Sequence, residues 1–280
     1  MKRIAFIADL FRNELLGGGE SNDANLIRHL MKQFEVLTYK CNKVTVQDLE
    51  KVDALIIGNF VWLPDNVKEY VINNAPYVIY EHDHKYVTTR DPSKFANFKA
   101  PTSYLVNEKF YNNAKTVVVL SKICEEVMKL NLPNAQVHSI GCSLWSPETL
   151  TLLRKLNKEP KIHDYGIMKS ANPTKNYTAT MNYCNSQNIT PLEMHSSNYY
   201  HFLEQMATCK NFIFLPTVLE TYSRICAEAK MLNLGVATNK KRIGFFSEPY
   251  SEQSGDELID TIEQKNIEAL EYFVNLIERI

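Results

Sequence analysis

Short runs of apolar and β-branched residues alternate with helical patterns along most of this 280-residue chain. In the first half the runs are Arg3 to Ala8, Glu35 to Tyr39, Ala54 to Gly58, Tyr77 to Tyr80, Thr116 to Leu120 and Val137 to Ile140. The segments between them have helical spacing, as Leu26, Ile27, Leu30 and Met31 illustrate. Because strand–helix–strand crossovers build parallel sheets, the pattern predicts an α/β fold whose sheet is covered on both faces.

The alternation is interrupted from Cys142 to Lys161, where two prolines and the charged run RKLNKEPK favour a linker. It then restarts on a smaller scale, with predicted strands near 165–168, 192–195 and 212–215 and helices starting near 177 and 199. The chain closes with one long amphipathic pattern. We therefore expect a first domain over residues 1–145, a second over 146–255 and a C-terminal helix over 256–280.

Charge and cysteine usage narrow the class of protein. The formal net charge of -1 provides no global attraction to nucleic acid or to an anionic membrane. The six cysteines form no CxxC pair, nothing resembles a secretory signal, and no apolar run approaches about 18 residues. These features predict a cytoplasmic protein that is not integral to a membrane.

Two glutamates stand out in the stretch NFIFLPTVLETYSRICAEAKMLNLGVAT, residues 211–238. Glu228 falls in the apolar stripe of a predicted helix, where an unpaired carboxylate is costly and needs a donor. A ligand hydroxyl is one such donor, and a neighbouring lysine, arginine or backbone amide is the other. Glu220 lies in the loop before that helix, whose first N–H groups are free for a ligand.

The seven residues between Glu220 and Glu228, together with the preceding strand and proline and the later Gly-Val-Ala, resemble the signature of GT-B glycosyltransferases of family 4. The resemblance implies two Rossmann-like domains facing across a cleft, an N-terminal acceptor domain and a C-terminal donor domain, with the C-terminal helix crossing back to the first. It also implies that Glu220 and the backbone of Thr221, Tyr222 and Ser223 hold the donor sugar, and that Glu228 holds the ribose of the nucleotide.

A glycine run, Gly17, Gly18 and Gly19, follows the first predicted strand and precedes the helix opened by Glu20. Glycines at this place allow close approach of the backbone to a phosphate, although a flexible turn is the alternative. The run lacks the spacing of a dinucleotide motif or a P-loop. GGGE resembles the start of the first helix in family 4, which implies contact with the phosphate of the donor or with the acceptor.

The strand Tyr77 to Tyr80 runs directly into Glu81, His82, Asp83 and His84, at the strand end where ligands of open α/β sheets bind. The family carries a His-Asp pair here, so the resemblance implies that His82 and Asp83 belong to the catalytic site. We expect His84 at the surface. A His-x-His metal pair is the alternative, but no third ligand at a recognisable spacing accompanies it, and no metal is predicted.

Lys169 and Lys175 lie in GIMKSANPTKN, between a predicted strand and helix, where they would neutralise the diphosphate of a leaving group. Lys175 aligns with a lysine of the family, and Lys169 would replace its arginine. Solvated surface lysines are the alternative.

The predicted function is transfer of a sugar from a nucleoside-diphosphate sugar, with a UDP-sugar favoured, to a hydroxyl acceptor, with no cofactor and no metal and with retention of anomeric configuration. The acceptor stays open among glycan, lipid, small molecule and a hydroxymethylated base in DNA. Lys85 and Arg90, in a loop with interleaved aromatic residues, are the candidate DNA contacts, unless the loop is simply solvated. Two rivals remain: a non-catalytic nucleotide-sugar binding module, and a metal-dependent hydrolase using Glu81 to His84. The sequence does not indicate an oligomeric state.

Overall fold

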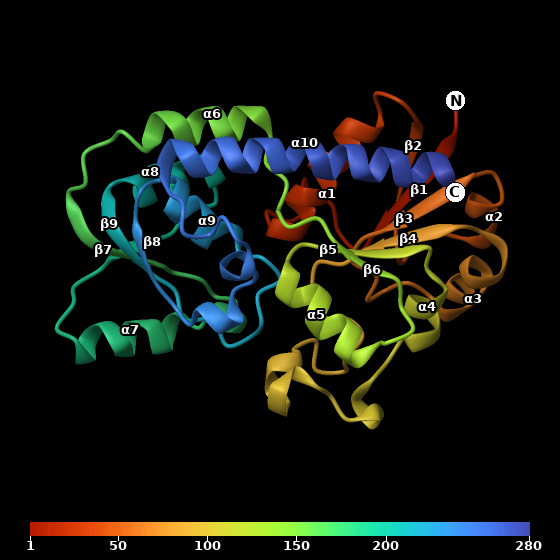
Figure 1. Ribbon diagram of the computed structural model, residues 1–280, viewed down its shortest axis with the longest axis horizontal. Coiled ribbons are helices and arrows are strands. Elements are labelled where there is room, and N and C mark those ends of the chain that lie inside the picture. Colours follow the sequence, from red (N-terminus) through yellow and green to blue (C-terminus); the bar gives the residue numbers. More distant parts are fainter. The chain divides into compact units, whose positions relative to one another are not determined.

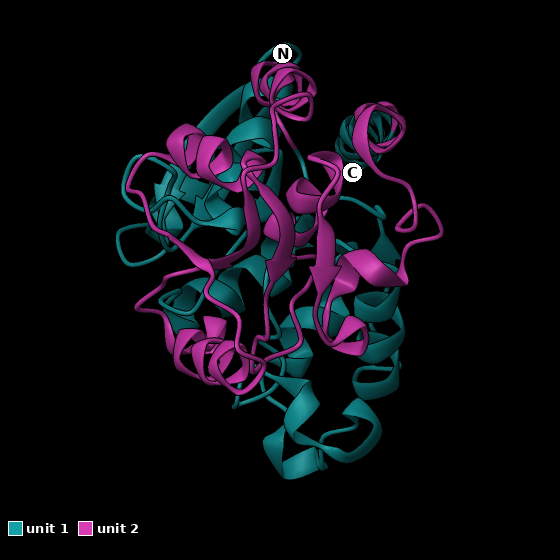
Figure 2. Cartoon of the chain, turned by 90° about the vertical axis from the view of Figure 1, so that its left-hand side faces the viewer, with its two compact units in different colours: residues 1–144, 265–280 teal, residues 145–264 magenta.

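The computed structural model describes all residues from Met1 to Ile280, and the chain divides into two compact units. Unit 1 contains residues 1–144 and 265–280, and unit 2 contains residues 145–264 (Figures 1 and 2).

Unit 1 is built on one parallel sheet of six strands in the order β2-β1-β3-β4-β5-β6 (Figure 1). Its strands are β1 (Arg3–Ala8), β2 (Glu35–Lys40), β3 (Ala54–Ile57), β4 (Tyr77–Tyr80), β5 (Thr116–Val119) and β6 (Val137–Ser139). Each predicted strand of this half is confirmed with ends within one residue. The strands β3 and β4 are buried along their whole length, as expected for a parallel sheet covered on both faces.

The helices of unit 1 are α1 (Gly18–Leu30), α2 (Val46–Leu49), α3 (Asp65–Asn74), α4 (Glu108–Asn113) and α5 (Lys122–Asn131). Three residues of the predicted stripe of α1, Leu26, Ile27 and Leu30, are buried. Met31, predicted with them, is the C-cap of the helix and is exposed. Between β4 and α4 the chain forms three single turns of 3₁₀ helix, η1 (Pro92–Lys94), η2 (Ala96–Phe98) and η3 (Thr102–Tyr104).

Unit 2 is built on a second parallel sheet, with the strand order β10-β9-β7-β8 and helices on both sides (Figure 2). Its strands are β7 (His163–Met168), β8 (Leu192–Met194), β9 (Cys209–Ile213) and β10 (Gly235–Ala237). Its helices are α6 (Pro147–Leu156), α7 (Tyr177–Ser186), α8 (Tyr199–Ala207) and α9 (Arg224–Met231), with short 3₁₀ turns η4 (Pro173–Lys175), η5 (Lys240–Arg242) and η6 (Gly244–Ser247).

The segment predicted as a linker, residues 142–161, contains the division between the two units and also helix α6, which the sequence analysis did not predict. The Ser146 side chain accepts from the backbone N–H of Thr149 at 3.3 Å, and Pro147 occupies the first helical position. Both are typical of a helix start. The two prolines that suggested a break therefore include one that begins a helix.

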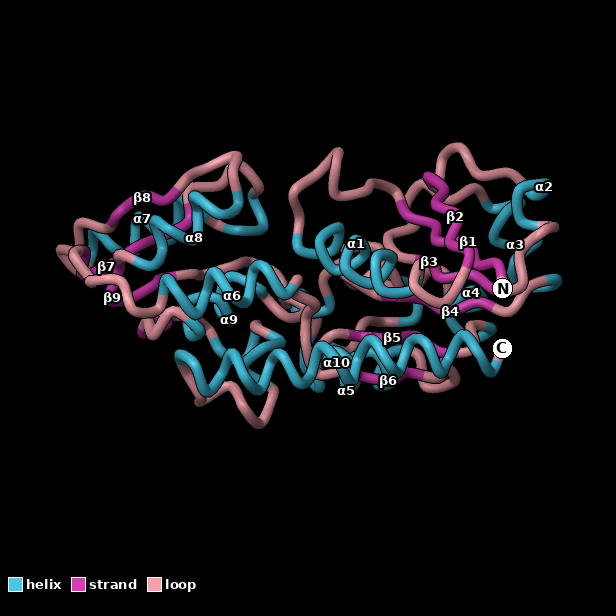
Figure 3. Tube along the Cα trace, turned by 90° about the horizontal axis from the view of Figure 1, so that it is seen from above, coloured by secondary structure: helices cyan, strands magenta, loops and turns pink.

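The last helix, α10 (Gly255–Arg279), is one uninterrupted helix of 25 residues (Figure 3). Its first residues belong to unit 2, where Asp260 and Glu263 bind Arg154 of α6 at 2.6 and 2.8 Å. Its later residues belong to unit 1, where Phe273 lies against Tyr80 with ring centroids 4.9 Å apart. No helix of the chain has the length and apolar character needed to cross a membrane.

Candidate functional site

In unit 2 the loops that follow β7 and β9 are bonded to each other at the carboxyl edge of the sheet. The Thr217 N–H donates to the Thr174 carbonyl at 3.0 Å, and the Asn176 side chain donates to the Leu215 carbonyl at 2.8 Å. Since β7 and β9 are neighbours in the sheet, the two loops form one surface at the strand ends. This edge is where ligands of open α/β sheets bind.

Lys175 and Glu220, predicted separately, meet on this surface. The Lys175 ammonium lies 2.7 Å from Oε1 of Glu220, and both side chains are mostly buried. The Glu220 backbone is fixed on both sides: its N–H donates to the Arg242 carbonyl and its carbonyl accepts from Gly244, each at 2.9 Å. The cation and the carboxylate are therefore held on two loops that the sheet brings together.

Lys169 is engaged in a different contact. Its ammonium lies 3.0 Å from Glu193 and over the ring of Tyr177, and its side chain is half exposed. The hydrogen bond to Glu193 raises the pKa of Lys169, so the charge is kept. No contact joins Lys169 to the pair formed by Lys175 and Glu220.

The backbone before α9 has a conformation that sets the start of the helix. Ser223, its N-cap, is left-handed with φ 67°. The Tyr222 side chain is buried, and its hydroxyl lies 2.8 Å from that of Tyr250. The Tyr222 side chain is therefore part of the core of unit 2, and the role of its backbone in holding a donor sugar stays a prediction.

Glu228 of α9 is fully buried, and its two oxygens differ. Oε1 accepts from the Trp145 indole at 2.9 Å and the Tyr199 hydroxyl at 2.5 Å, and the Arg224 guanidinium lies 3.5 Å away. Oε2 is buried without a hydrogen-bond partner. Protein donors thus satisfy one oxygen of Glu228, as one of the two alternatives predicted. The other oxygen accepts no hydrogen bond from the protein.

In unit 1 the glycine run lies against the histidine of the predicted catalytic pair. Gly17 is the N-cap of α1, and Gly18 and Gly19 form its first turn, so the helix begins two residues earlier than expected. A Cβ on Gly19 would lie 3.2 Å from His82 side-chain atoms. A side chain at position 19 would therefore require the His82 ring to shift by a few tenths of an ångström.

His82 is held by a residue that the sequence analysis missed. Its Nε2 lies 2.6 Å from Oδ1 of Asp23 on α1, and both side chains are buried. Glu20, one turn earlier on α1, is also buried, and burial raises its pKa. The glycine run, Asp23 and His82 thus form one cluster at the carboxyl ends of β1 and β4.

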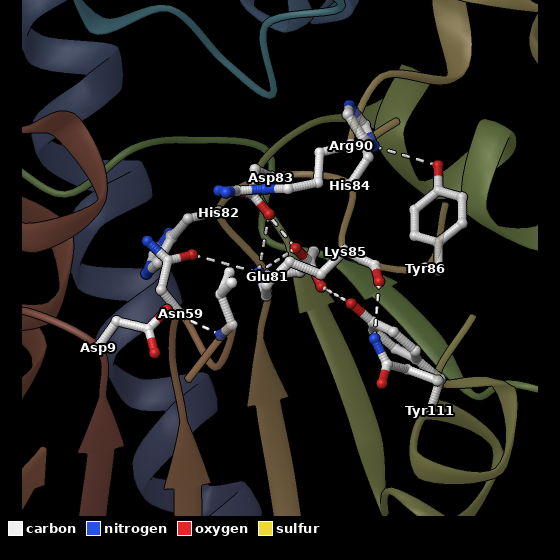
Figure 4. Close-up of polar contacts among 12 residues, drawn as sticks. Asp9, Asn59, Glu81, His82, Asp83, His84, Lys85, Tyr86, Arg90 and Tyr111 are labelled. Atoms are coloured by element: carbon white, nitrogen blue, oxygen red, sulfur yellow. Dashed lines mark hydrogen bonds and ion pairs between the residues drawn. The ribbon is translucent and has the colours of Figure 1, made fainter. Parts of the chain in front are cut away.

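The other polar residues after β4 form a buried network, which Figure 4 shows. Lys85 donates to Glu81, to Asp83 at 3.1 Å and to Asn59 at 3.2 Å. Glu81 also accepts from Tyr111, and Asp83 also accepts from Arg90. Burial opposes ionisation of Asp83, but the charges of Lys85 and Arg90 outweigh it and lower its pKa to about 2.

Two expectations for this segment were wrong. His84, expected at the surface, is buried with its Nδ1 3.1 Å from the Tyr86 hydroxyl. Lys85, a candidate DNA contact, is 3% exposed and fully occupied by protein acceptors, so it cannot reach a phosphate in this structure. The Arg90 side chain pairs with Asp83 but is half exposed, so it lies at the surface.

No group of three His, Cys, Asp or Glu side chains is arranged to hold a metal ion. The residues that would form the hydrolase site, Glu81 to His84, are instead divided among protein partners: Lys85, Asp23, Arg90 and Tyr86.

Two of the missed residues carry a signal in the sequence. Asp23 precedes Leu26, Ile27 and Leu30 by three, four and seven positions, so it is a carboxylate within an apolar stripe, like Glu228. Arg224 stands four positions before Glu228, the spacing of a helical ion pair. Nothing local marks Trp145 or Tyr199, because their contact with Glu228 is made only by folding.

No protein-family model matches the chain, and no curated protein is similar to it. Solved structures do match. Sucrose-phosphate synthase from Thermosynechococcus elongatus has a TM-score of 0.59 at 10% identity, over 100% of this chain and 98% of that one. HepE of Anabaena in complex with UDP and glucose matches with a TM-score of 0.56 at 13% identity, over 97% of this chain and 100% of that one. An alpha-glucosyltransferase in complex with UDP and DNA containing an HMU base matches with a TM-score of 0.52 at 12% identity, over 96% of this chain and 94% of that one. At these identities the likeness shows the fold: the chain has the GT-B fold with two Rossmann-like domains, as predicted.

Proposed function

We propose that this protein is a glycosyltransferase that moves a sugar from a nucleoside-diphosphate sugar, with UDP as the nucleotide, to a hydroxyl group of an acceptor. The contact between Lys175 and Glu220 carries the proposal. It brings a cation and a carboxylate together at the carboxyl edge of the sheet, Lys175 from the loop after β7 and Glu220 from the loop that leads to the start of α9. A diphosphate needs the cation, and a sugar hydroxyl needs the carboxylate.

The chemistry required of the protein is mostly stabilisation of negative charge on the leaving diphosphate. Lys175 and the backbone N–H groups at the start of α9 would provide it, and Glu220 would accept from hydroxyls of the transferred sugar. Because these groups supply positive charge and donors themselves, we propose that the reaction proceeds without a metal. Retention of configuration and membership of family 4 belong to the same proposal and rest on the spacing of Glu220 and Glu228.

In unit 1 we propose that His82 acts beside the transferred sugar, with the Asp23 carboxylate fixing the orientation of its ring. Gly19 provides the space for this ring. Asp83, ion-paired with Lys85 and Arg90, stabilises the segment that carries His82. Lys169, which pairs with Glu193, would contribute only if a bound diphosphate drew it away from that carboxylate.

The donor is supported by two neighbours that bind UDP, and one of them also binds DNA with an HMU base. Acceptor screens should therefore include hydroxymethylated DNA beside glycans, lipids and small hydroxyl compounds. Arg90 is the one predicted DNA contact whose side chain reaches the surface.

A thermal-shift screen of nucleoside-diphosphate sugars tests the donor. A ligand at a hundred times its dissociation constant adds about 2.7 kcal/mol to the free energy of unfolding. Slow hydrolysis of the best ligand should then be measured with EDTA present. Stabilisation without hydrolysis or transfer would instead indicate a binding module, and activity that EDTA abolishes would contradict metal independence.

The Lys175→Met variant tests the proposed role of Lys175 at the diphosphate. It should weaken UDP binding about tenfold or more, since a charged hydrogen bond is worth roughly 1.5–3 kcal/mol. Lys210→Met is the matched control, because Lys210 forms an exposed pair with Asp164 at 2.7 Å in the same unit. Equal UDP affinity in the two variants would refute the role of Lys175.

A further inference from the structure

The two carboxylate oxygens of Glu228 differ in the number of hydrogen bonds that they accept. A carboxylate oxygen has about two acceptor positions, and on Oε1 the Trp145 indole and the Tyr199 hydroxyl occupy both. Oε2 has no hydrogen-bond partner although it is buried. Leaving a buried acceptor unsatisfied costs free energy, so the site lacks one donor that a ligand can supply.

The two donors on Oε1 are fixed by their own surroundings. The Arg224 guanidinium lies over the Trp145 indole, 4.4 Å from its ring. Tyr199 is the first residue of α8, whose N-terminus is capped by the Asn198 side chain. Burial, and next the charge of Glu228, raise the pKa of Tyr199, so its hydroxyl keeps the proton that it donates. Oε1 is therefore not available to a ligand.

We propose that Trp145 and Tyr199 are positioning residues that reserve Oε2 of Glu228 for a single ribose hydroxyl of the bound nucleotide. The inference rests on the proposed function, because it concerns the nucleotide of the same donor. A carboxylate with both oxygens open can accept from both hydroxyls of a ribose. With Oε1 occupied it accepts from one, so the two hydroxyls contribute unequally to binding.

Calorimetric titration of the full chain with UDP, 2′-deoxy-UDP and 3′-deoxy-UDP tests this inequality. One analogue should bind roughly ten- to hundredfold more weakly than UDP, and the other within about twofold. The Tyr199→Phe variant opens a position on Oε1, so the second hydroxyl should begin to contribute and the two analogues should become more alike. Tyr200→Phe, at a neighbouring side chain that is 41% exposed, should keep the wild-type pattern.

Tryptophan fluorescence gives a second readout that does not depend on activity. Because Oε2 is covered, a hydroxyl reaches it only when neighbouring side chains shift, and Trp145 shares the carboxylate. Trp62→Phe leaves Trp145 as the one tryptophan of the two in the chain. UDP should then change its emission.

The outcomes separate the two proposals. If UDP binds and both analogues weaken equally, or neither weakens, the inference is overturned and the glycosyltransferase function stands. An unchanged Trp145 emission at saturating UDP also overturns it. If neither UDP nor any other nucleoside diphosphate binds, the proposed function fails first, and the inference fails with it.

Discussion

Replacement of Lys85 by methionine should reveal how strongly the buried network of unit 1 holds the segment after β4. Lys85 is 3% exposed, and its ammonium donates to Glu81, Asp83 and Asn59. Removal of one partner from a buried ion pair costs about 3–5 kcal/mol, because the other charge stays buried. At about 2–4 °C per kcal/mol the melting temperature should fall by roughly 6–20 °C.

The loss of stability in the Lys85→Met variant should depend on pH, because Glu81 is titratable. Burial raises the pKa of Glu81, and the Lys85 charge opposes that rise. Without Lys85 the pKa of folded Glu81 rises further above its unfolded value. The unfolded chain then ionises first as the pH increases, so the variant loses stability between the unfolded and the folded pKa. We expect a larger difference from wild type at pH 8 than at pH 5.

Urea unfolding at both pH values, followed by circular dichroism, measures this effect. Lys109→Met is the matched control in the same unit, since Lys109 pairs with Glu69 at 2.7 Å at the surface, where an ion pair is worth at most about 1 kcal/mol. The double variant Glu81→Gln, Lys85→Met should recover part of the lost stability, because glutamine leaves no unpaired charge at position 81. If Lys85→Met is no more destabilising than Lys109→Met, or its loss is the same at pH 5 and pH 8, the reasoning is refuted.

Three further changes test other parts of the site. Gly19→Ala places a Cβ 3.2 Å from His82 and should lower the transfer rate about tenfold or more by displacing the ring, as initial rates would show. Asp23→Asn should reduce kcat while the donor KM changes little, and an equal effect on both would contradict the role of Asp23 in orienting His82. Ser223→Gly should raise the free energy of unfolding by up to about 1 kcal/mol, because glycine adopts φ 67° without strain, whereas Ser223→Val should lower it.

The strand pattern of this chain is readable because parallel strands buried on both faces are short, apolar and bounded by polar segments. That is why β1 and β4 were found with their ends correct and why the carboxyl edge of each sheet could be named. Helix α6 was missed because a proline and a charged run were interpreted as a break. The same proline, preceded by Ser146, is equally typical of a helix start.

Side-chain partners were harder to predict than elements. His84 and Lys85 look like surface residues by type, yet the fold gives both of them hydrogen-bond partners: Tyr86 for the imidazole, and Glu81, Asp83 and Asn59 for the ammonium. Asn59 lies in the loop after β3 and Tyr111 lies on α4, so their proximity to this segment is a product of topology. No spacing within the segment after β4 encodes it.

A carboxylate within an apolar helical stripe occurs in both units and has the same consequence in each. Asp23 on α1 binds the His82 ring, and Glu228 on α9 binds Trp145 and Tyr199. In each case the cost of burying the charge is offset by side-chain donors, so burial alone does not identify a ligand site. The two cases differ in what remains: one oxygen of Glu228 has no partner, and the donors on its other oxygen leave that oxygen no free position. We therefore expect the number of acceptor positions still open on each oxygen, rather than the presence of a buried charge, to decide whether such a carboxylate can accept from a ligand hydroxyl.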